Sequence, residues 1–322
     1  MSAPFDHGVF LDLATIDNGD VSLDALDGTC RDWRYHRTTT AQTLAERIAD
    51  MQVVVTNKVV LDRAVLTAAT TLRLVCIAAT GTNNVDLAAA RDLGIAVTNV
   101  TGYATPSVVQ HVFAGVLAHA TRMSAYADSV AAGDWSRSAQ FCLLDHPIRE
   151  VAGQRLGIVG YGELGRAVAR VAEAFGMHVL IAARPGGPVQ PGRVPLAELL
   201  PQVHVLSLHC PLAENTRGLI GAAELAAMRP DALLINTARG GIVDEAALAE
   251  ALRNRTLGSA VVDVLSAEPP PADHPLLAPD IPGLTVTPHV AWASRESRQR
   301  LIDGITANIV AFAARELGPS RQ

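Results

Sequence analysis

The segment GIVGYGELG (residues 157–165) decides the fold that this sequence predicts. It places Gly160, Gly162 and Gly165 between an apolar run typical of a strand and a helical stretch. The first glycine permits a tight turn, the second lets the backbone approach a pyrophosphate, and the third lets the helix pack against the strand. The predicted helix has one apolar face, made by Leu164, Val168, Val171, Ala172 and Phe175. The pattern indicates a dinucleotide site at the amino end of that helix but does not identify a reaction.

Short β-rich runs alternate with alanine-rich helical stretches, a pattern typical of parallel sheets covered by helices. The first part of the chain predicts strands at 8–13, 50–57, 72–80 and 95–100, with helices at 43–49 and 85–94. A helical region at 106–133 and an aperiodic arm at 134–150 follow. The second part predicts strands at 154–160, 178–183, 204–210, 232–238, 259–265 and 284–290, with helices at 222–228 and 244–254, the second of them capped by Asp244. The predicted fold class is α/β with two doubly wound parallel sheets and a final helix at 293–316.

The composition limits the class of protein. A chain of 322 residues suits two domains, and 49% hydrophobic against 18% charged residues indicates well-buried cores. The formal net charge of −6 argues against a nucleic-acid partner, which would require a basic surface. No apolar run is long enough to span a membrane, and the amino terminus lacks the features of a signal peptide. We therefore expect a cytoplasmic protein with no nucleic-acid or membrane partner.

The cysteines and histidines give no sign of a metal site or a disulfide. The four cysteines are far apart in the sequence: Cys30, Cys76, Cys142 and Cys210. None of them shows the Cys/His spacing of a zinc site, and we interpret them as reduced thiols. His204 and His209 share one predicted strand on opposite faces, which makes joint metal binding improbable.

Three polar residues suggest a reaction: Arg239, Glu268 and His289. Each stands at or just after the end of one of the last three predicted strands, where open α/β sheets bind their ligands. A guanidinium group can bind the carboxylate of a 2-oxo acid and polarise its keto oxygen. An imidazole can deliver the proton as hydride arrives, and a carboxylate beside it can orient it. Taken singly, each could instead be an ordinary surface or packing residue; together they favour catalysis.

The segment HVLIAARPGG (residues 178–187) bears on the choice of nucleotide. An acid at this strand end would bind the adenosine ribose and repel a 2′-phosphate, but the chain has Ala183 followed by Arg184. A guanidinium group could pair with the phosphate, and Gly186 and Gly187 leave room for it. We expect the enzyme to prefer NADPH/NADP while NADH/NAD remains possible. The alternative is that Arg184 faces solvent and the enzyme does not discriminate.

With these residues in place, the chain resembles the D-isomer-specific 2-hydroxyacid dehydrogenases and, within them, the hydroxypyruvate reductase branch. The resemblance covers nearly the whole chain through ATGTNNVDL (79–87), NVTGYATPSVVQH (99–111), GIVGYGELGRAVA (157–169), LHCPLAENTRGLIG (208–221), LINTARGGIVDEAAL (234–248), DVLSAEPP (263–270) and TPHVAWAS (287–294). It implies NAD(P)-dependent reduction of a small 2-oxo acid to the D-2-hydroxy acid, and the reverse reaction. The implied substrate is hydroxypyruvate, with glyoxylate as a second one.

The resemblance also implies a division of the chain into domains. Residues 1–102 and 291–322 would form a flavodoxin-like substrate domain, and residues 103–290 a Rossmann nucleotide-binding domain, with the cofactor in the cleft. A homodimer would form through the helix and arm near 106–150.

The matching motifs assign roles to individual residues. Arg239 would bind the substrate, Glu268 would pair with His289, and His289 would be the catalytic acid/base. Backbone groups of Thr80 and Gly81 would hold the substrate carboxylate. The expected cofactor contacts are Thr105, Gly160, Gly162, Glu163, Leu164, Gly165, Arg184, Cys210, Pro211, Thr216, Thr237, Ala238, Asp263 and His289. The chain departs from the commoner family pattern at Gln110, where many members carry Glu, and at Ala183, where most carry an acid.

Other functions stay open at this stage. One is a D-2-hydroxyacid dehydrogenase for a larger side chain. A formate dehydrogenase is less consistent with the sequence, because Glu268 stands where those enzymes carry Gln. A third is a nucleotide-sensing binding protein of the co-repressor type, which can retain the same three residues. The absence of basic or Pro/Ser-rich extensions favours a metabolic enzyme.

Overall fold

The computed structural model describes residues 3–188 and 190–317, and the chain forms two compact units. Unit 1 comprises Met1–Ala104 and Trp292–Gln322, and unit 2 comprises Thr105–Ala291. From the sequence we expected the domain boundaries to fall after residues 102 and 290. In the described parts of the chain, no helix is long and apolar enough to span a bilayer. The four cysteines are free thiols.

Unit 1 is built on a five-stranded parallel sheet with the order β2-β1-β3-β4-β5. Its strands are β1 (Phe5–Phe10), β2 (Cys30–Tyr35), β3 (Val53–Thr56), β4 (Leu74–Ile77) and β5 (Ala96–Asn99). This order is the flavodoxin-like one. β3 and β4 are buried along their whole length, as expected of central strands covered on both faces.

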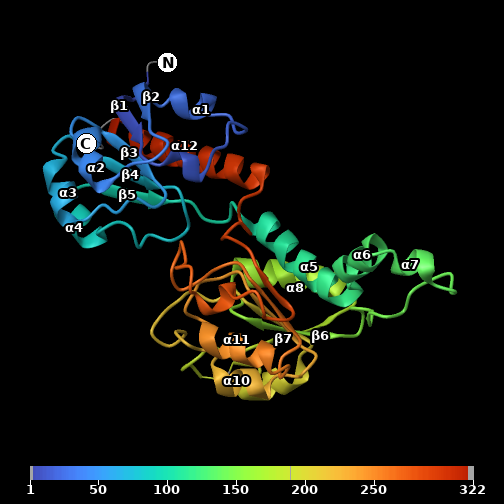
Figure 1. Cartoon of the computed structure of the whole chain (residues 1–322). Helices are drawn as coiled ribbons and strands as arrows, with labels where there is room; N and C mark the ends of the chain where they lie inside the picture. Colours follow the sequence, from blue (N-terminus) through green and yellow to red (C-terminus); the bar gives the residue numbers. More distant parts are fainter. Residues whose placement is uncertain (1–2, 189, 318–322) are drawn as a thin grey trace. The chain divides into compact units, whose positions relative to one another are not determined.

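Helices cover both faces of this sheet (Figure 1). They are η1 (Leu13–Thr15), α1 (Asp24–Asp27), α2 (Ala41–Ile48), α3 (Arg63–Ala68), α4 (Leu87–Asp92) and α12 (Arg295–Leu317). The long helix α12 buries Leu301, Ile305 and Ile309 against one face of the sheet. Leu44 of α2 and Leu66 of α3 lie in a second apolar cluster against the other face. The final helix of the chain therefore completes the core of the first unit.

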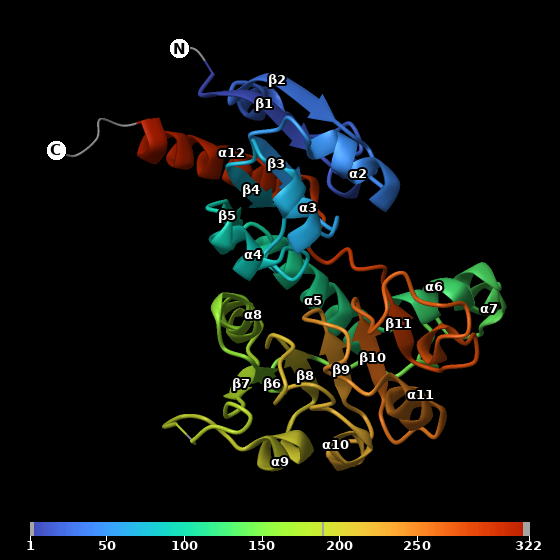
Figure 2. The same ribbon diagram turned by 90° about the vertical axis from the view of Figure 1, so that its left-hand side faces the viewer.

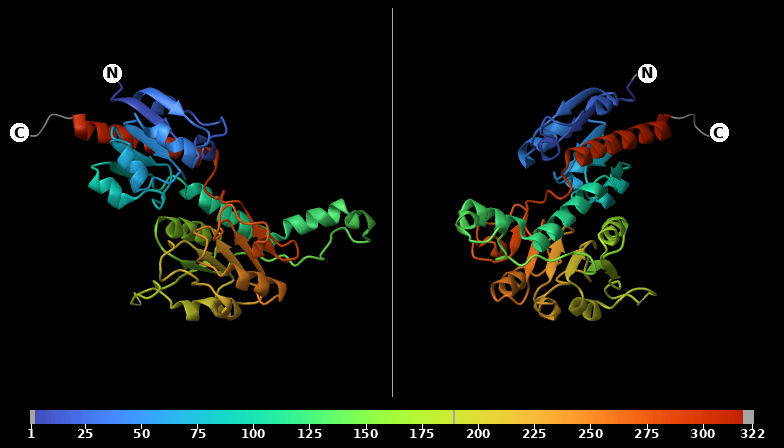
Figure 3. Two further views of the ribbon diagram at one scale, coloured as in Figure 1. Left: turned by 60° about the vertical axis from the view of Figure 1, so that its left-hand side comes forward. Right: turned by 90° about the vertical axis from the view of Figure 1, so that its right-hand side faces the viewer.

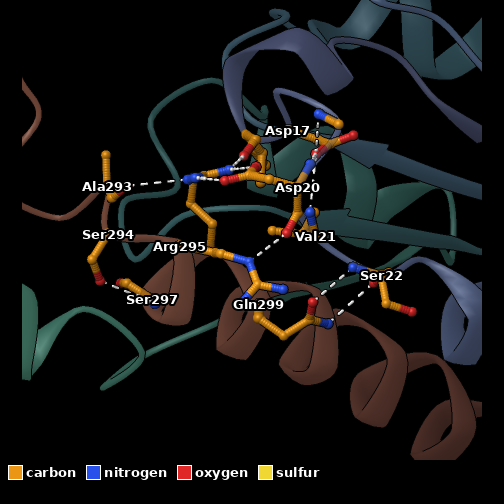
Figure 4. A network of polar contacts seen from close by, with 12 residues as sticks. Asp17, Asp20, Val21, Ser22, Ala293, Ser294, Arg295, Ser297 and Gln299 are labelled. Atoms are coloured by element: carbon orange, nitrogen blue, oxygen red, sulfur yellow. Dashed lines mark hydrogen bonds and ion pairs between the residues drawn. The ribbon is translucent and has the colours of Figure 1, made fainter.

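A polar network fixes the start of α12 to the loop after η1 (Figure 4). The nearly buried Arg298 donates from both terminal nitrogens to Asp20, at 2.6 and 2.7 Å, and from Nε to the carbonyl of Ala293 at 3.1 Å. Arg295 donates to the carbonyl of Asp20 at 2.7 Å. The segment just after the return of the chain into unit 1 is thus held by charge-assisted bonds.

Unit 2 is built on a six-stranded parallel sheet with the order β11-β10-β9-β8-β6-β7 (Figure 2). Its strands are β6 (Arg155–Val159), β7 (His178–Ile181), β8 (Val205–Leu208), β9 (Leu233–Asn236), β10 (Ser259–Val262) and β11 (Leu284–Val286). The direction of winding reverses between β6 and β8. In open α/β sheets this switch point, at the carboxyl ends of the strands, is where ligands bind.

The helices of unit 2 either cover its sheet or form an arm. They are α5 (Thr105–Thr121), α6 (Met123–Ala131), α7 (Asp134–Arg137), α8 (Glu163–Ala174), α9 (Leu196–Leu199), η2 (Leu200–Gln202), α10 (Ala222–Ala227), α11 (Glu245–Arg253) and η3 (Pro275–Leu277). The predicted N-cap is confirmed, because the Asp244 carboxylate accepts from the amides of Ala246 and Ala247. Helices α6 and α7 project away from the sheet (Figure 3).

The structure corrects several predicted elements. The sequence analysis missed β2, whose exposed, polar edge residues hide its strand character. The first strand begins at Phe5 rather than residue 8. The helical region splits at Arg122, which has a φ of +52°, and α7 lies within the segment expected to be an aperiodic arm. Phe175 was expected on the buried face of its helix, but it is 40% exposed and stacks on Phe113.

Candidate active site

The glycine turn connects β6 to α8 at the carboxyl edge of the sheet of unit 2. Gly160 has a φ of +92°, and a Cβ there would lie 2.5 Å from the backbone nitrogen of Cys210. The turn therefore lies against the residues that follow β8, at the switch point of the sheet. A Cβ on Gly165 would lie 2.2 Å from the carbonyl oxygen of Gly160. Both positions require glycine, because any side chain would collide with backbone.

The second glycine of the turn leaves space for a ligand. A Cβ on Gly162 would meet no described atom within 4 Å, and Gly162 is the residue at the amino end of α8. Two buried polar atoms directly after β8 and β9, His209 Nδ1 and Thr237 Oγ1, have no hydrogen-bond partner in the described chain. Burial lowers the pKa of His209 to about 4, so its ring is neutral at neutral pH. An open backbone turn with unused polar atoms fits the pyrophosphate of a dinucleotide.

Other expected cofactor residues surround this turn in unit 2. Thr105, at the start of α5, donates from Oγ1 to Glu163 at 2.6 Å and so joins α5 to the start of α8. The Thr216 hydroxyl accepts from Ala213 N at 2.7 Å and donates to the carbonyl of Pro211 at 2.7 Å. The hydroxyl therefore shapes the loop after β8. Three further expected contacts are buried or half-buried side chains: Leu164, Cys210 and Ala238.

The end of β7 shows residues that the sequence analysis missed. Ala183 donates its N–H to the carbonyl of Val194 at 2.8 Å, which brings the neighbouring Arg193 beside the predicted ribose-binding position. The guanidinium carbon of Arg193 lies 5.0 Å from the ring centre of Tyr161, in the glycine turn, and that of Arg166 lies 5.9 Å away. Cationic groups thus flank the turn in addition to the exposed Arg184. Arg193 was missed because β7 ends well before it in the sequence, and no local pattern indicates that the chain returns to this strand end.

Two of the three predicted catalytic side chains meet directly. His289 Nδ1 donates to Glu268 Oε2 at 2.6 Å, and Glu268 Oε1 accepts from the amide of Leu265 at 2.9 Å. The side chains of His289 and Glu268 are 29% and 35% exposed, so a ligand can reach them. Because the carboxylate accepts at Nδ1, it favours the tautomer of the neutral imidazole that carries its proton there.

The backbone at His289 is strained and is held in place by Asp263. His289 has a φ of +56°, in the left-handed region that side chains rarely adopt. The buried Asp263 accepts from the hydroxyl of Thr287 at 2.5 Å and from the amides of Val290 and Ala291 at 2.9 Å each. These bonds flank His289 on both sides and offset the strain. The sequence predicted Asp263 only as a cofactor contact, because a turn of this kind has no local signature.

Arg239 reaches the same edge of the sheet through a tight turn after β9. Asn236 accepts from the amide of Ala238 at 3.1 Å and donates to the carbonyl of Arg239 at 3.0 Å. The exposed Arg239 side chain is folded onto the carbonyl of Ala238, at 2.6 Å from Nη1. A Cβ on Gly240 would lie 2.0 Å from the carbonyl carbon and oxygen of Leu265. The turn that carries Arg239 therefore packs on the segment that holds Glu268.

The remaining predicted residues lie elsewhere. Thr80 and Gly81 belong to unit 1, where the Thr80 hydroxyl donates to the carbonyl of Val100 at 3.2 Å. His204 and His209 flank β8 instead of lying within it. His204 Nδ1 accepts from the amide of Arg155 at 3.1 Å, which is a structural contact. Within residues 3–188 and 190–317, no group of His, Cys, Asp and Glu has the arrangement of a metal site.

The geometry agrees with what the chain is similar to. Residues 113–291 match the family model described as "D-isomer specific 2-hydroxyacid dehydrogenase, NAD binding domain". A glycerate dehydrogenase of Methylorubrum extorquens is 44% identical over 298 residues, which are 90% of this chain and 94% of that protein. A hydroxypyruvate reductase of Blautia hydrogenotrophica is 34% identical, covering 94% and 96% of the two chains. A crystal structure of a Thermus thermophilus protein superposes with a TM-score of 0.81 at 34% identity, covering 95% and 96%.

These similarities extend over both units. The structure shows the glycine turn of a nucleotide site and, in the same unit, an imidazole paired with a carboxylate. The chain belongs to the D-isomer-specific 2-hydroxyacid dehydrogenases and is an oxidoreductase that acts on small 2-oxo and 2-hydroxy acids with a nicotinamide nucleotide.

Proposed function

We propose that this enzyme reduces hydroxypyruvate, and also glyoxylate, to the corresponding 2-hydroxy acid, giving D-glycerate from hydroxypyruvate. The observation that carries the chemistry is the 2.6 Å bond between His289 and Glu268 at the carboxyl edge of the sheet. The choice of substrate is supported by the glycerate dehydrogenase and the hydroxypyruvate reductase to which the chain is similar.

The residues divide the reaction among them. A bound reduced nicotinamide would supply the hydride to the keto carbon. The backbone at Thr80 and Gly81 binds the substrate carboxylate, and the Arg239 guanidinium polarises the keto oxygen. His289 donates its Nε2 proton to that oxygen as negative charge develops, which completes the hydroxyl group. Glu268 orients the imidazole through its bond to Nδ1.

We propose NADPH as the preferred cofactor. Ala183 lacks the carboxylate that would bind the ribose of NADH and repel a 2′-phosphate. Arg184 is exposed immediately after it, and Arg193 lies beside the same strand end. Gly187 N donates to the Arg184 carbonyl at 3.0 Å and closes a turn after this strand end. Because Gly187 has no side chain, the turn leaves room for a phosphate.

We further propose a homodimer that forms through the helix and arm near residues 106–150. Large apolar side chains are exposed along it: Met123 (70%), Val130 (50%), Trp135 (52%), Phe141 (89%), Leu144 (83%) and Ile148 (59%). A group of apolar side chains in so short a segment is unusual for a free surface and marks a site of association. A second copy of the same arm, equally apolar, would cover it.

One assay tests substrate and cofactor together. The kcat/KM values for hydroxypyruvate, glyoxylate, pyruvate and a bulkier 2-oxo acid are measured with NADPH and with NADH. We expect hydroxypyruvate to have the highest value, with NADPH. A higher value for the bulky acid would favour the alternative of a larger side chain. Tight nucleotide binding without turnover of any acid would favour a nucleotide-sensing binding protein.

A further inference from the structure

Glu245 and His274 form a buried pair that has no role in the proposed reaction. The pair contacts the segment that carries Glu268. The side chains of Glu245 and His274 are only 11% and 5% exposed. His274 Nδ1 accepts from the amide of Leu276 at 3.2 Å and thereby caps η3. A nitrogen that accepts carries no proton, so the ring proton is on Nε2 and is donated to Glu245 Oε2 at 2.9 Å.

Glu245 holds both ends of the segment 266–274. Its Oε1 accepts from the amide of Ser266 at 2.7 Å, and its Oε2 accepts from the Ser266 hydroxyl at 2.6 Å as well as from His274. Glu245 is also the first residue of α11, where the helix dipole favours negative charge. Charge-assisted bonds to a buried anion are among the stronger hydrogen bonds in proteins.

The segment between these ends carries the proposed pairing acid. It contains Glu268 followed by prolines at 269–271, whose rings restrict the backbone. Leu265, next to the clamped Ser266, donates its amide to Glu268. Gly240 packs on the backbone of Leu265 and Ser266, so Ser266 cannot shift without moving the turn of Arg239. The position of Ser266 therefore controls the position of the Glu268 carboxylate.

We infer that Glu245 and His274 are positioning residues, which act through Ser266 and Leu265 to hold Glu268 against His289. This inference rests on the roles proposed above for Glu268 and His289. Asp263 and, through the Thr287 hydroxyl, His111 also face the His289 segment, but they contact it from other elements and do not touch Glu245.

Two substitutions of one residue separate this role from simple packing. In His274→Gln the amide nitrogen takes the place of Nε2 and still donates to Glu245, but the cap of η3 is lost. In His274→Asn the amide oxygen takes the place of Nδ1 and keeps the cap, but the bond to Glu245 is lost. His204→Asn is the matched control, because His204 also accepts a backbone amide through Nδ1 but lies at the amino end of β8.

For the full-length enzyme we expect His274→Asn to lower kcat for hydroxypyruvate reduction about tenfold or more, since small misplacements of catalytic groups are costly. Nucleotide binding, followed by fluorescence titration, should stay within about threefold, because the nucleotide turn is untouched. The pH at which reduction falls to half its maximum should move lower, since a displaced carboxylate no longer favours the charged imidazole. His274→Gln and His204→Asn should match the wild type in kcat, in nucleotide binding and in the pH midpoint.

Equal losses in His274→Asn and His274→Gln with an unchanged pH midpoint would overturn the inference, as would a fully active His274→Asn. If His274→Asn does not fold, Ser266→Ala takes its place, because it removes only the hydroxyl donor to Glu245. Ser266→Ala should also move the pH midpoint lower. An unchanged midpoint in this variant would contradict the inference. Glu268→Gln is measured alongside. If it retains normal kcat and pH profile, the proposed role of Glu268 fails; if it is impaired while His274→Asn is not, only the positioning role fails.

Discussion

Gly240 and Leu265 are in backbone contact: a Cβ at residue 240 would lie 2.0 Å from the Leu265 carbonyl. This contact joins the turn after β9, which carries Arg239, to the turn after β10, which carries Glu268. It exists only because β9 and β10 are neighbours in the sheet. The distance between the proposed substrate-binding group and the proposed pairing acid is therefore set by backbone packing.

Gly240→Ala should separate these two turns. We expect kcat for hydroxypyruvate reduction to fall about a hundredfold, because a methyl group cannot fit without moving backbone. Steady-state kinetics and a thermal melt measure the effect. Gly28→Ala is the control, since Gly28 has a φ of −68° and no atom within 3.4 Å of its Cβ position. Normal turnover in Gly240→Ala would show that the two turns are free to move apart.

His289→Ala should lose about a hundredfold or more in turnover if His289 delivers the proton. In the wild type the reduction rate should fall as pH rises, because the imidazole then lacks the proton to be donated; in the oxidation direction it should fall as pH drops. Rates across pH 5–9 in both directions provide the measurement, with nucleotide binding as the control. Near-full turnover by a variant that binds nucleotide normally would contradict the assignment.

Arg239→Lys keeps the positive charge but loses the planar group that can bind a carboxylate or a keto oxygen through paired donors. We expect both the affinity for hydroxypyruvate and kcat to collapse while nucleotide affinity changes only a few-fold. Substrate kinetics and nucleotide titration on the same preparation distinguish these effects. An equal loss of substrate and nucleotide binding would mean that Arg239 serves the cofactor or the fold.

Ala183→Asp should weaken or reverse the preference for NADPH, because the carboxylate would bind the ribose of NADH and repel a 2′-phosphate. Arg184→Ala should lower kcat/KM for NADPH by about tenfold and leave that for NADH nearly unchanged, since one charge-assisted hydrogen bond is lost. The ratio of kcat/KM for the two cofactors is the measured quantity. A wild-type enzyme that clearly favours NADH would refute the interpretation of this strand end.

Phe141→Asp combined with Leu144→Asp should convert the enzyme to monomers, since charges would replace side chains that are 89% and 83% exposed. Sedimentation velocity measures the mass of wild type and variant. Val60→Asp is the control, because Val60 is 62% exposed but belongs to unit 1 and is not part of the arm. A monomeric wild type would disprove the proposed homodimer.

Several features could be predicted because they depend on local sequence. The α/β class followed from alternating strand and helix patterns, and the Asp244 cap followed from the residue type that helix ends favour. The glycine turn was found because the spacing of Gly160, Gly162 and Gly165 between a strand and a helix is itself a local pattern. The edge strand β2 was missed, because only Cys30 of its six residues is buried and its three charged residues are exposed.

The sequence by itself determined which chemical groups the protein has at its strand ends: a guanidinium, a carboxylate, an imidazole and no acid at Ala183. Only the tertiary structure decided how they meet. The bond from His289 to Glu268, the approach of Arg193 to Tyr161 and the clamp of Glu245 on Ser266 and His274 join residues from different loops. The physical reason is that such distances depend on strand order and on the packing of successive turns, which no local pattern encodes.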